Sequence, residues 1–176
     1  MGKKKETISK DPLIKAYTIE DKKIGIQKNK EKAFLLFGEH ARELISSETG
    51  FHLLTDFCQD DLQNTANFIL ENFILKMVII ANPTGRKIVE EGNFCWRGNQ
   101  NKVDINRNWG FQWKAKQPID DFIQTDPGKK KFSEPETKAL QKAIRLFRPD
   151  IFLSVHSGMN SLMFPYAYSM KKRNNK

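Results

Sequence analysis

Three short apolar segments constrain the fold of this chain more than any other feature. They cover residues 33–37, 76–81 and 151–155, and turn-forming or polar residues stand at their ends. Such segments are typical of strands buried on both faces, and these strands belong mainly to parallel sheets covered by helices. Segments of helical character separate them, so we expect an α/β layered fold with the three segments in one sheet.

Two amphipathic helices are expected between the first two apolar segments, over residues 42–57 and 62–73. The first of these helices is expected to bury four apolar residues: Leu44, Ile45, Phe51 and Leu54. Two short strands, over residues 16–20 and 23–27, are expected before the first apolar segment. Helices and strands thus alternate along the first half of the chain.

The second half of the chain contains a long segment of little periodicity and one clear helix. Residues 82–85, Asn-Pro-Thr-Gly, predict a turn, and residues 86–132 are expected to form functional loops. A helix is expected from there to about residue 147, with Ser133 as its cap, Glu136 completing a capping box and Pro135 in the first turn.

Charge and hydropathy exclude several classes of protein. The formal net charge is +9, from 30 Lys and Arg against 21 Asp and Glu, and the basic residues occur in short runs along the chain. Such runs are typical of solvated loops and tails, so no nucleic-acid partner is expected. The apolar segments are far shorter than the roughly 20 residues of a membrane-spanning helix, so no membrane span is expected.

The N-terminus and the cysteines leave the compartment open. The basic residues 3–5 are not followed by an apolar segment, so no signal peptide is expected in this sequence. Cys58 and Cys95 are the two cysteines, and the sequence does not decide whether they pair. The oligomeric state is equally open.

Two histidines follow the ends of apolar segments. His40 comes after residues 33–37 and forms a His-x-x-Glu pair with Glu43, while His156 comes directly after residues 151–155. Ligands bind at the carboxyl ends of strands in open α/β sheets, and two histidines with one glutamate are a ligand set of catalytic zinc. On position alone, His156 also fits a hydrogen-bonded core histidine, and His52 fits a structural or surface residue.

Two arginines lie in polar loops beside asparagine and tryptophan residues. Arg97 follows Trp96, and Arg107 follows Asn106 in the segment 103–109. Arginine side chains match carboxylates in two-point contacts and can stabilise an oxyanion as it forms. The alternative at this point is a set of surface loops anchored by tryptophan.

Taken together, these motifs resemble the zinc carboxypeptidases, peptidase family M14, most closely the branch found in plants and protists. Six motifs follow the family's order: His-Ala-Arg-Glu at 40–43, Asn-Pro-Thr-Gly-Arg at 82–86, Trp-Arg at 96–97, Asp-x-Asn-Arg-Asn-Trp at 104–109, Phe-Ser-Glu-Pro-Glu-Thr at 132–137 and Ser-Val-His-Ser-Gly at 154–158. The resemblance covers about residues 33–166. It implies a three-layer α/β/α fold around a mixed, largely parallel central sheet.

The resemblance also implies roles for individual residues. His40, Glu43 and His156 would bind one Zn²⁺ ion, and Arg97 would polarise the scissile carbonyl and hold the oxyanion. Four further residues would bind substrate: Asn106 and Arg107 at the terminal carboxylate, and Arg42 and Ser157 further out along the groove. The expected partners are the C-termini of peptides or proteins, which a metallocarboxypeptidase hydrolyses with metal-activated water.

The sequence departs from the family pattern in one respect that concerns activity. The family's glutamate general base and its usual tyrosine lie well after the last zinc histidine, and no position of this sequence matches them. We therefore expect residues 15–170 to form a partial catalytic domain, with a sheet incomplete at its C-terminal side, between a basic flexible tail at 1–14 and a basic tail at 171–176. Alone it is expected to bind zinc but hydrolyse peptides poorly.

Two other functions fit the same residues. One is an amidohydrolase of N-acyl amino acids, similar to aspartoacylase, which shares the His-x-x-Glu and Asp-x-Asn-Arg motifs. The other is a non-catalytic fragment or pseudoenzyme that binds zinc or peptide C-termini. The Trp96-Arg97 step and the long segment 104–109 favour peptides over small acylated amino acids. The preferred terminal side chain stays open.

Overall fold

The structure is a computed structural model that describes residues 2–21, 30–57, 63–115 and 124–159. Its elements follow one another along the chain in this order: β1 (Gly2–Lys10), β2 (Leu13–Glu20), β3 (Glu31–Leu36), α1 (Leu44–Asp56), α2 (Gln63–Asn72), β4 (Phe73–Val78), α3 (Pro83–Glu90), the 3₁₀ helix η2 (Ile105–Arg107), α4 (Pro135–Phe147) and β5 (Ile151–Ser154). No helix among the described residues is long and apolar enough to cross a membrane.

The five strands form one mixed sheet in the order β1-β2-β4-β3-β5. Strands β4, β3 and β5 are parallel to one another, whereas β2 is antiparallel to both of its neighbours. Leu36 at the end of β3 lies opposite both Val78 of β4 and Ser154 of β5, so the carboxyl ends of the three parallel strands are level. The three predicted apolar segments therefore meet at one edge of the sheet.

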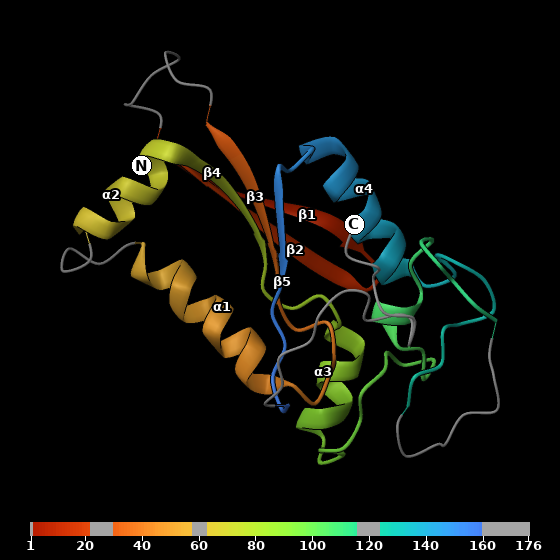
Figure 1. The fold of residues 1–176 in the computed structure, drawn as a ribbon. Coiled ribbons are helices and arrows are strands. Elements are labelled where there is room, and N and C mark those ends of the chain that lie inside the picture. Colours follow the sequence, from red (N-terminus) through yellow and green to blue (C-terminus); the bar gives the residue numbers. More distant parts are fainter. Residues whose placement is uncertain (1, 22–29, 58–62, 116–123, 160–176) are drawn as a thin grey trace, which may run out of the picture.

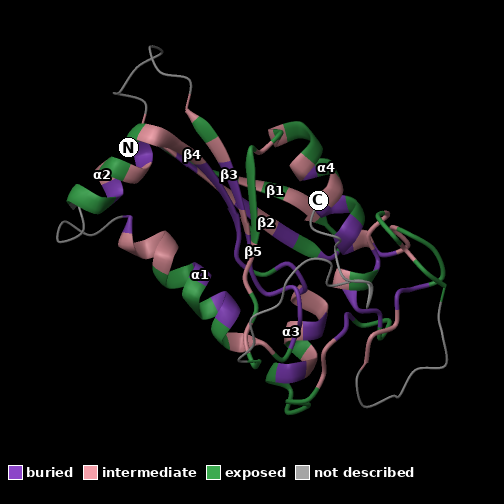
Figure 2. Cartoon of the chain, viewed as in Figure 1, coloured by how far each residue is buried: buried purple, intermediate pink, exposed green. Residues whose placement is uncertain are grey.

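Helices cover both faces of the sheet, as Figure 1 shows, with α1 and α2 on one side and α4 on the other. One apolar core joins α4 to the sheet around Phe34, Leu36 and Leu140, all of which are fully buried. The second core joins α1 and α2 to the opposite face around Phe37 and Met77. This confirms the predicted α/β/α layering, and Figure 2 shows the buried residues concentrated where helices and sheet meet.

The predicted tail at residues 1–14 is wrong, because Gly2–Lys10 is the edge strand β1 and pairs with β2 along its length. Glu6 of β1 forms an ion pair with Lys76 of β4 across the face that α4 covers. Edge strands often carry charged side chains, and the lysines of β1 follow that pattern. Because β1 is rich in lysine, its sequence lacks the apolar pattern that predicts a strand. The strand predicted over residues 23–27 and the tail at 171–176 lie outside the described residues.

The buried side of α1 also differs from the prediction. Ile45 and Phe51 are 69% and 53% exposed, whereas the helix buries Ser46, Ser47 and Gly50. A Cβ atom on Gly50 would lie 2.7 Å from the ring of Phe37. The first half of the helix thus approaches the sheet so closely that small side chains lie between them, whereas Leu53 and the predicted Leu54 in its second half pack against the core.

Three further boundaries differ from the predictions. The turn expected at residues 82–85 is the start of α3, where the side chain of Asn82 caps the helix by accepting from Gly85 N at 2.9 Å. The helix expected to reach residue 73 ends one residue earlier, and Phe73 begins β4, which ends at Val78 and not at the expected residue 81. The cap of α4 is Glu134, without the side-chain bond that the predicted Ser133 cap would make.

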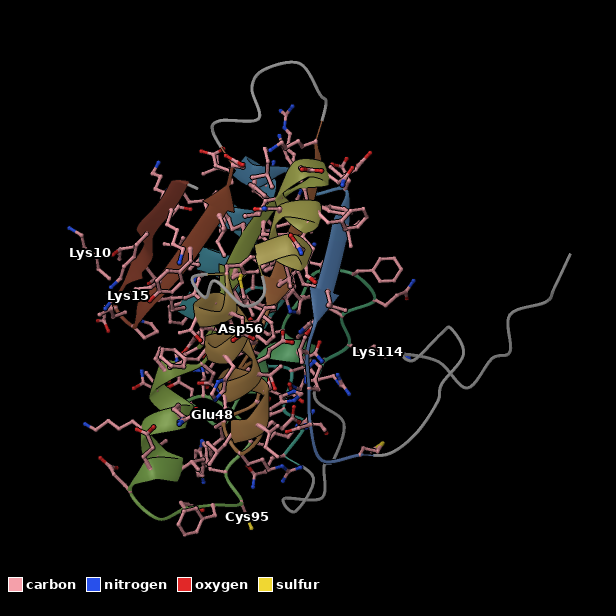
Figure 3. All side chains as sticks on the ribbon, turned by 90° about the vertical axis from the view of Figure 1, so that its left-hand side faces the viewer. Lys10, Lys15, Glu48, Asp56, Cys95 and Lys114 are labelled. Atoms are coloured by element: carbon pink, nitrogen blue, oxygen red, sulfur yellow. The ribbon has the colours of Figure 1, made fainter. Side chains whose placement is uncertain are left out.

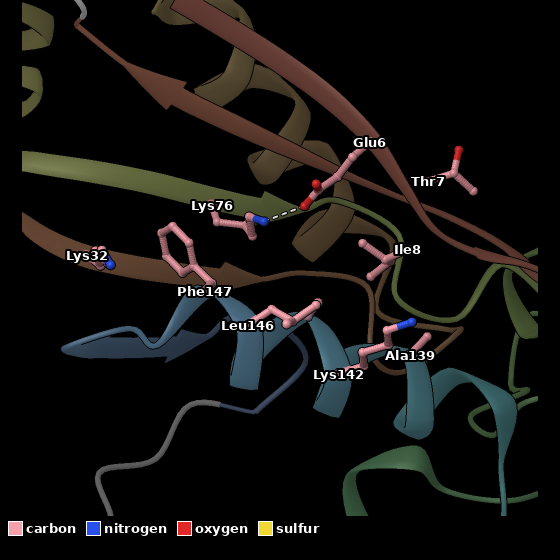
Figure 4. A pocket seen from close by; sticks show the side chains of 10 residues that line it. Glu6, Thr7, Ile8, Lys32, Lys76, Ala139, Lys142, Leu146 and Phe147 are labelled. Atoms are coloured by element: carbon pink, nitrogen blue, oxygen red, sulfur yellow. Dashed lines mark hydrogen bonds and ion pairs between the residues drawn. The ribbon is translucent and has the colours of Figure 1, made fainter.

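A cavity of about 430 Å³ lies between β1 and α4, away from the carboxyl ends of the parallel strands (Figure 4). Ile8, Leu146 and Phe147 form apolar walls, and Lys32, Lys76 and Lys142 also line it. The ammonium group of Lys76 lies 5.1 Å from the centre of the Phe147 ring, in addition to its ion pair with Glu6. The charge of Lys76 is therefore satisfied within the fold.

Candidate metal centre

A sharp turn at Gly38 carries the chain from β3 to the candidate ligands. Gly38 has a φ of +63°, and a Cβ atom there would lie 2.3 Å from Oγ of Ser47. Only glycine adopts this conformation readily and leaves room for α1. The amides of Ala81 and Asn82 donate to the carbonyls of Phe37 and Gly38, both at 3.0 Å, which fixes the turn against the segment after β4.

The hydroxyl of Ser46 holds the N-terminal end of α1 to the sheet. Its Oγ accepts from the amide of Gly38 at 3.0 Å and donates to the carbonyl of Val155 at 2.5 Å. A single buried side chain thus joins the turn after β3 to the end of β5. His40 and His156, which are 116 positions apart in sequence, are brought together by this arrangement.

The side chains of His40, Glu43 and His156 converge as the sequence predicted. One potential ligand atom from each lies within 4.8 Å of the others. Nδ1 of His40 lies 2.8 Å from Oε1 of Glu43, and Nδ1 of His156 lies 2.9 Å from Oε2 of the same carboxylate. The two Nδ1 atoms are 3.1 Å apart. Both imidazoles therefore direct the same kind of nitrogen toward one carboxylate.

The three donors fit a zinc ion. Ligands bonded to tetrahedral zinc at about 2.0–2.1 Å lie about 3.3 Å apart, so these donors need to move outward by only a few tenths of an ångström. Two histidines and one glutamate leave the fourth position open, which distinguishes catalytic from structural zinc sites. His52, the third histidine, is exposed on α1 and is not a member of this group.

In each candidate zinc histidine, the ring nitrogen that does not face Glu43 lies close to another carboxylate. Nε2 of His40 lies 3.0 Å from Oδ1 of Asp104, which is completely buried. Nε2 of His156 lies 2.9 Å from Oγ of Ser154 and 3.4 Å from Oε2 of Glu39. Partners of this kind hold the ring and the tautomer that a metal requires. Neither carboxylate is among the site residues predicted from the sequence, although Asp104 stands inside the Asp-x-Asn-Arg motif and Glu39 directly precedes His40.

These contacts shift the protonation equilibria of the site. Hydrogen bonds to Glu39 and Glu43 raise the pKa of His156 to about 9, although burial lowers it. Burial also lowers the pKa of His40, but hydrogen bonds to Asp104 and Glu43 outweigh it and leave the pKa above its ordinary value. Burial raises the pKa of Glu43, yet hydrogen bonds from both histidines hold that pKa well below its usual range. Glu43 is therefore ionised and ready to bind a cation.

The guanidinium of Arg97 lies beside the ligand group. Its Nε and Nη2 atoms lie 3.0 and 2.9 Å from Oδ2 of Asp104, and Nη1 lies 3.5 Å from Oε1 of Glu43. The carbonyl of Arg97 accepts from the amide of Ala41 at 2.9 Å, which ties this loop to the His-Ala-Arg-Glu segment. Asp104 thus contacts both a candidate ligand and the predicted oxyanion donor.

The predicted substrate residues Asn106 and Arg107 lie in the 3₁₀ helix η2, directly after Asp104. Oδ1 of Asp104 accepts from the amide of Asn106 at 2.9 Å and caps this turn. Arg107 is exposed, and its Nη1 donates to the carbonyl of Asn106 at 3.3 Å. The guanidinium is thus at the surface close to the ligand group, where it can meet a solute.

Two buried asparagines shape the loops that carry these residues. Asn99 donates to Glu134 at 2.8 Å and to Glu136 at 3.1 Å, and its Oδ1 accepts from the amides of Asn101 and Val103. The side chain of Asn108 makes five bonds to residues 127–137, before and within the start of α4: to Pro127 O, Lys130 O and Ser133 Oγ, and from Glu134 N and Thr137 Oγ1. Of the residues expected to form loops, 86–90 belong to α3, and the segments 91–115 and 124–132 are loops ordered by these side-chain bonds.

Arg42 and Ser157, which the resemblance places further out along the groove, directly precede Glu43 and follow His156 in the sequence. Arg42 is exposed, and its Nη1 donates to the carbonyl of Cys95 at 3.3 Å; Figure 3 shows Cys95 at one end of the molecule. Ser157 contacts Oε2 of Glu43 through its backbone amide, at 3.2 Å.

Cys95 has a free thiol, and Cys58 lies outside the described residues.

Comparison with known proteins assigns the fold. The structure is similar to the crystal structure of thrombin activatable fibrinolysis inhibitor, with a TM-score of 0.82 and 21% sequence identity over 98% of this chain and 46% of that chain. At this level of identity the likeness concerns the fold alone. It confirms the predicted α/β carboxypeptidase fold.

The sequence comparisons assign the family. The chain is 30% identical to zinc carboxypeptidase A 1 of Drosophila melanogaster over 151 residues, which are 81% of this chain and 35% of that protein. It is 26% identical to an inactive metallocarboxypeptidase of Ajellomyces capsulatus over 162 residues, 81% of this chain and 27% of that protein. The chain thus spans about a third of the length of these relatives. The family model described as zinc carboxypeptidase matches residues 10–176, and the chain belongs to the zinc carboxypeptidase family.

Proposed function

We propose that this chain forms the zinc-binding and carboxylate-binding part of a metallocarboxypeptidase, which removes C-terminal residues from peptides or proteins. The observation that carries the proposal is the convergence of His40, Glu43 and His156, whose ligand atoms lie within 4.8 Å of one another. The position of Arg97 beside Glu43 supports it further. An ion pair alone would not require two imidazoles to direct equivalent nitrogens toward one carboxylate.

The two imidazoles and the Glu43 carboxylate would hold one Zn²⁺ ion. When bound, zinc supplies Lewis-acid polarisation of a carbonyl and a water of lowered pKa. Arg97 lies 3.5 Å from Glu43 and can donate to an oxygen that becomes negative during attack on the peptide carbonyl. Its contacts with Asp104 hold the guanidinium in place before substrate arrives.

Asn106 and Arg107 would bind the terminal carboxylate of the substrate. The exposed guanidinium of Arg107 provides paired donors for a carboxylate, and the η2 turn places it next to Asp104, which orients His40 and Arg97. Holding the substrate by its free carboxylate restricts the chain to the last peptide bond, which would explain an exopeptidase rather than an endopeptidase. Arg42 and Ser157 would contribute further along the substrate.

Membership of the family does not by itself establish activity, since an inactive metallocarboxypeptidase is among the similar proteins. Binding of zinc and of peptide carboxylates is therefore the more direct consequence of the geometry. The catalytic assignment applies to the protein in which these residues act together with a base.

Titration of the metal-free chain with zinc, followed by calorimetry, tests the proposal. We expect one ion per chain, and loss of binding in the His156→Gln variant. A fluorescent peptide with a free C-terminus should then bind the zinc-loaded chain more tightly than the same peptide with a C-terminal amide. The Arg107→Ala variant should reduce this difference. Failure of the wild-type chain to bind zinc would overturn the proposal.

A further inference from the structure

We propose that Glu39 is a positioning residue which determines, through the hydroxyl of Ser154, that Nε2 of His156 carries the ring proton. Nδ1 of His156 is then the nitrogen whose proton a metal ion displaces. This inference rests on the proposed zinc-binding function and deepens it. It assigns a role to a buried carboxylate that neither the sequence motifs nor the ligand group include.

Glu39 is 2% exposed, and both of its oxygens have partners. Oε1 accepts from the indole Nε1 of Trp109 at 3.2 Å, and Oε2 accepts from Oγ of Ser154 at 3.1 Å. Oγ of Ser154 lies in turn 2.9 Å from Nε2 of His156, and Oε2 of Glu39 itself lies 3.4 Å from the same nitrogen. A continuous row of hydrogen bonds therefore runs from Trp109 through Glu39 and Ser154 to the imidazole.

The chemistry of the groups fixes the direction of each bond in this row. The indole N–H of Trp109 can only donate, and a carboxylate can only accept. Ser154 has one proton, which it gives to Glu39, so its oxygen can only accept from His156. Nε2 must then be the nitrogen that keeps its proton, so the proton that a metal ion displaces is the one on Nδ1, which lies 2.9 Å from Oε2 of Glu43.

The row connects parts of the fold that are distant in sequence. Glu39 follows the turn at Gly38, Ser154 ends β5, and Trp109 follows the η2 turn. The ring of Trp109 is held in turn by an edge-to-face contact with Phe132, at 5.8 Å between ring centres. The loop that carries Asn106 and Arg107 is thereby coupled to the orientation of His156.

Glu39→Gln is the informative substitution, because the side chain keeps its shape but becomes a donor on one side. The amide oxygen must face the indole N–H of Trp109, so the amide NH₂ faces Ser154. The hydroxyl of Ser154 then accepts from the amide and donates to Nε2 of His156. This order favours the proton on Nδ1, where it competes with the metal. We expect zinc affinity to fall about 10–100-fold, the usual effect of losing such a partner.

Trp109→Phe provides a rescue that a purely structural role would not predict. Without the indole N–H, the side-chain amide that Glu39→Gln introduces can turn its oxygen toward Ser154 and restore the original direction of the bonds.

The double variant Glu39→Gln/Trp109→Phe should therefore bind zinc more tightly than Glu39→Gln alone, although it lacks one more contact. Trp109→Phe alone should change zinc affinity less than about threefold, because the carboxylate still accepts from Ser154.

The experiment measures zinc affinity of the full 176-residue chain by competition with a chelator, in the wild-type protein and these three variants. Circular dichroism establishes that each variant is folded. Glu91→Gln is the matched control, since Glu91 is exposed directly after α3 and pairs with Lys87 at 3.7 Å. Nitrogen-15 NMR of the zinc-loaded chain should also show the Nε2–H of His156 protected from solvent exchange in the wild type and unprotected in Glu39→Gln.

The outcomes separate this inference from the proposed function. A wild-type chain that binds no zinc overturns the proposed function and the role of Glu39 with it. A wild-type chain that binds zinc, together with a folded Glu39→Gln variant of equal affinity, overturns the role of Glu39 alone. A double variant that binds more weakly than Glu39→Gln also overturns it, because the direction of the bonds would then not decide the effect.

Discussion

Nε2 of His40 lies 3.0 Å from Oδ1 of Asp104, in a position where the imidazole is 3% exposed and the carboxylate not at all. The other oxygen of Asp104 contacts the guanidinium of Arg97 at 2.9–3.0 Å. One buried carboxylate thus orients a candidate zinc ligand and the candidate oxyanion donor together. The geometry of the site depends on this residue as much as on the ligands themselves.

We expect Asp104→Asn to weaken zinc binding about 10–100-fold. An amide cannot accept from both His40 and Arg97, since one of its two polar atoms is a donor. One partner therefore loses its bond whichever way the amide turns. Calorimetric titration with zinc measures the effect. Asp150→Asn is the control, because that carboxylate accepts from the amide of Lys32 at 2.8 Å, away from the ligand group. Equal affinity in a folded Asp104→Asn variant would contradict the role of Asp104.

The stability of the metal-free chain should fall as the pH rises from about 6.5 to 9. The pKa of His156 rises from its ordinary value of 6.5 to about 9 in the folded chain. Below pH 6.5 both the folded and unfolded states carry the proton, so the stabilisation is fully present. Between the two values only the folded state keeps it, and the stabilisation is lost by pH 9. Thermal unfolding at intervals of one pH unit measures this trend.

With zinc present, the stability of the chain should instead increase with pH, because the ion displaces the proton from His156. Apparent zinc affinity should rise by up to about tenfold per pH unit below pH 9 for each proton displaced. The His156→Gln variant should show a flatter stability profile without metal, whereas His52→Gln, on the exposed face of α1, should resemble the wild type. A metal-free wild-type chain whose melting temperature is constant from pH 6.5 to 9 would argue against the shifted pKa.

Gly38→Ala is expected to destabilise the fold by about 2–4 kcal/mol. Residue 38 has a φ of +63°, which alanine adopts only with strain, and the added Cβ atom would lie 2.3 Å from Oγ of Ser47. Gly92→Ala is the matched control, since Gly92 has a φ of +107° but nothing within 4 Å of the added Cβ. Gly92→Ala should lower the stability only through the strained backbone conformation, by about 1–2 kcal/mol. Urea denaturation of both variants measures the difference. Equal losses would show that contact with α1 does not matter at Gly38.

Much of the fold could be predicted because continuous apolar segments indicate buried strands whatever surrounds them. Residues 33–37 and 151–155 gave β3 and β5, and the polar residues after them correctly placed His40 and His156 at one edge of the sheet. Parallel strands bring their carboxyl ends together, so the ligand group follows from order along the chain.

What the sequence did not reveal depends on contacts between distant segments. The buried face of α1 is made by Ser46, Ser47 and Gly50 because the helix lies close to Phe37, and an apolar pattern cannot report that distance. Strand β1 contains one apolar residue, Ile8, and its pairing with β2 places it in the sheet. Asp104 and Glu39 act on His40 and His156 only after folding has brought them there.

Asn108→Ala should destabilise the loop that carries Asn106 and Arg107. Its amide makes five hydrogen bonds in a fully buried position, and alanine would leave several buried partners unsatisfied. We expect a loss of about 2–5 kcal/mol. Asn72→Ala is the control, because Asn72 donates one exposed bond to Phe68 O at 2.7 Å. Urea denaturation gives the stability, and limited proteolysis should cut residues 99–134 faster in Asn108→Ala. Equal behaviour of the two variants would contradict the prediction.

Strand β5 should cause the chain to self-associate. It pairs with β3 on one side, and no strand within the described ranges pairs with its other side. Ile151, Phe152 and Leu153 are 48%, 48% and 51% exposed, so an apolar strand with free backbone groups faces solvent. Such an edge is a template for pairing with another chain.

Leu153→Lys should therefore reduce association, because a charged side chain at the edge opposes strand pairing. Sedimentation velocity at about 5–50 μM protein should show a smaller fraction of oligomers for Leu153→Lys than for the wild type. Ile45→Lys is the matched control, since Ile45 is 69% exposed on α1, away from the sheet edge. If Ile45→Lys reduced association as much as Leu153→Lys, general hydrophobicity rather than the β5 edge would be the cause.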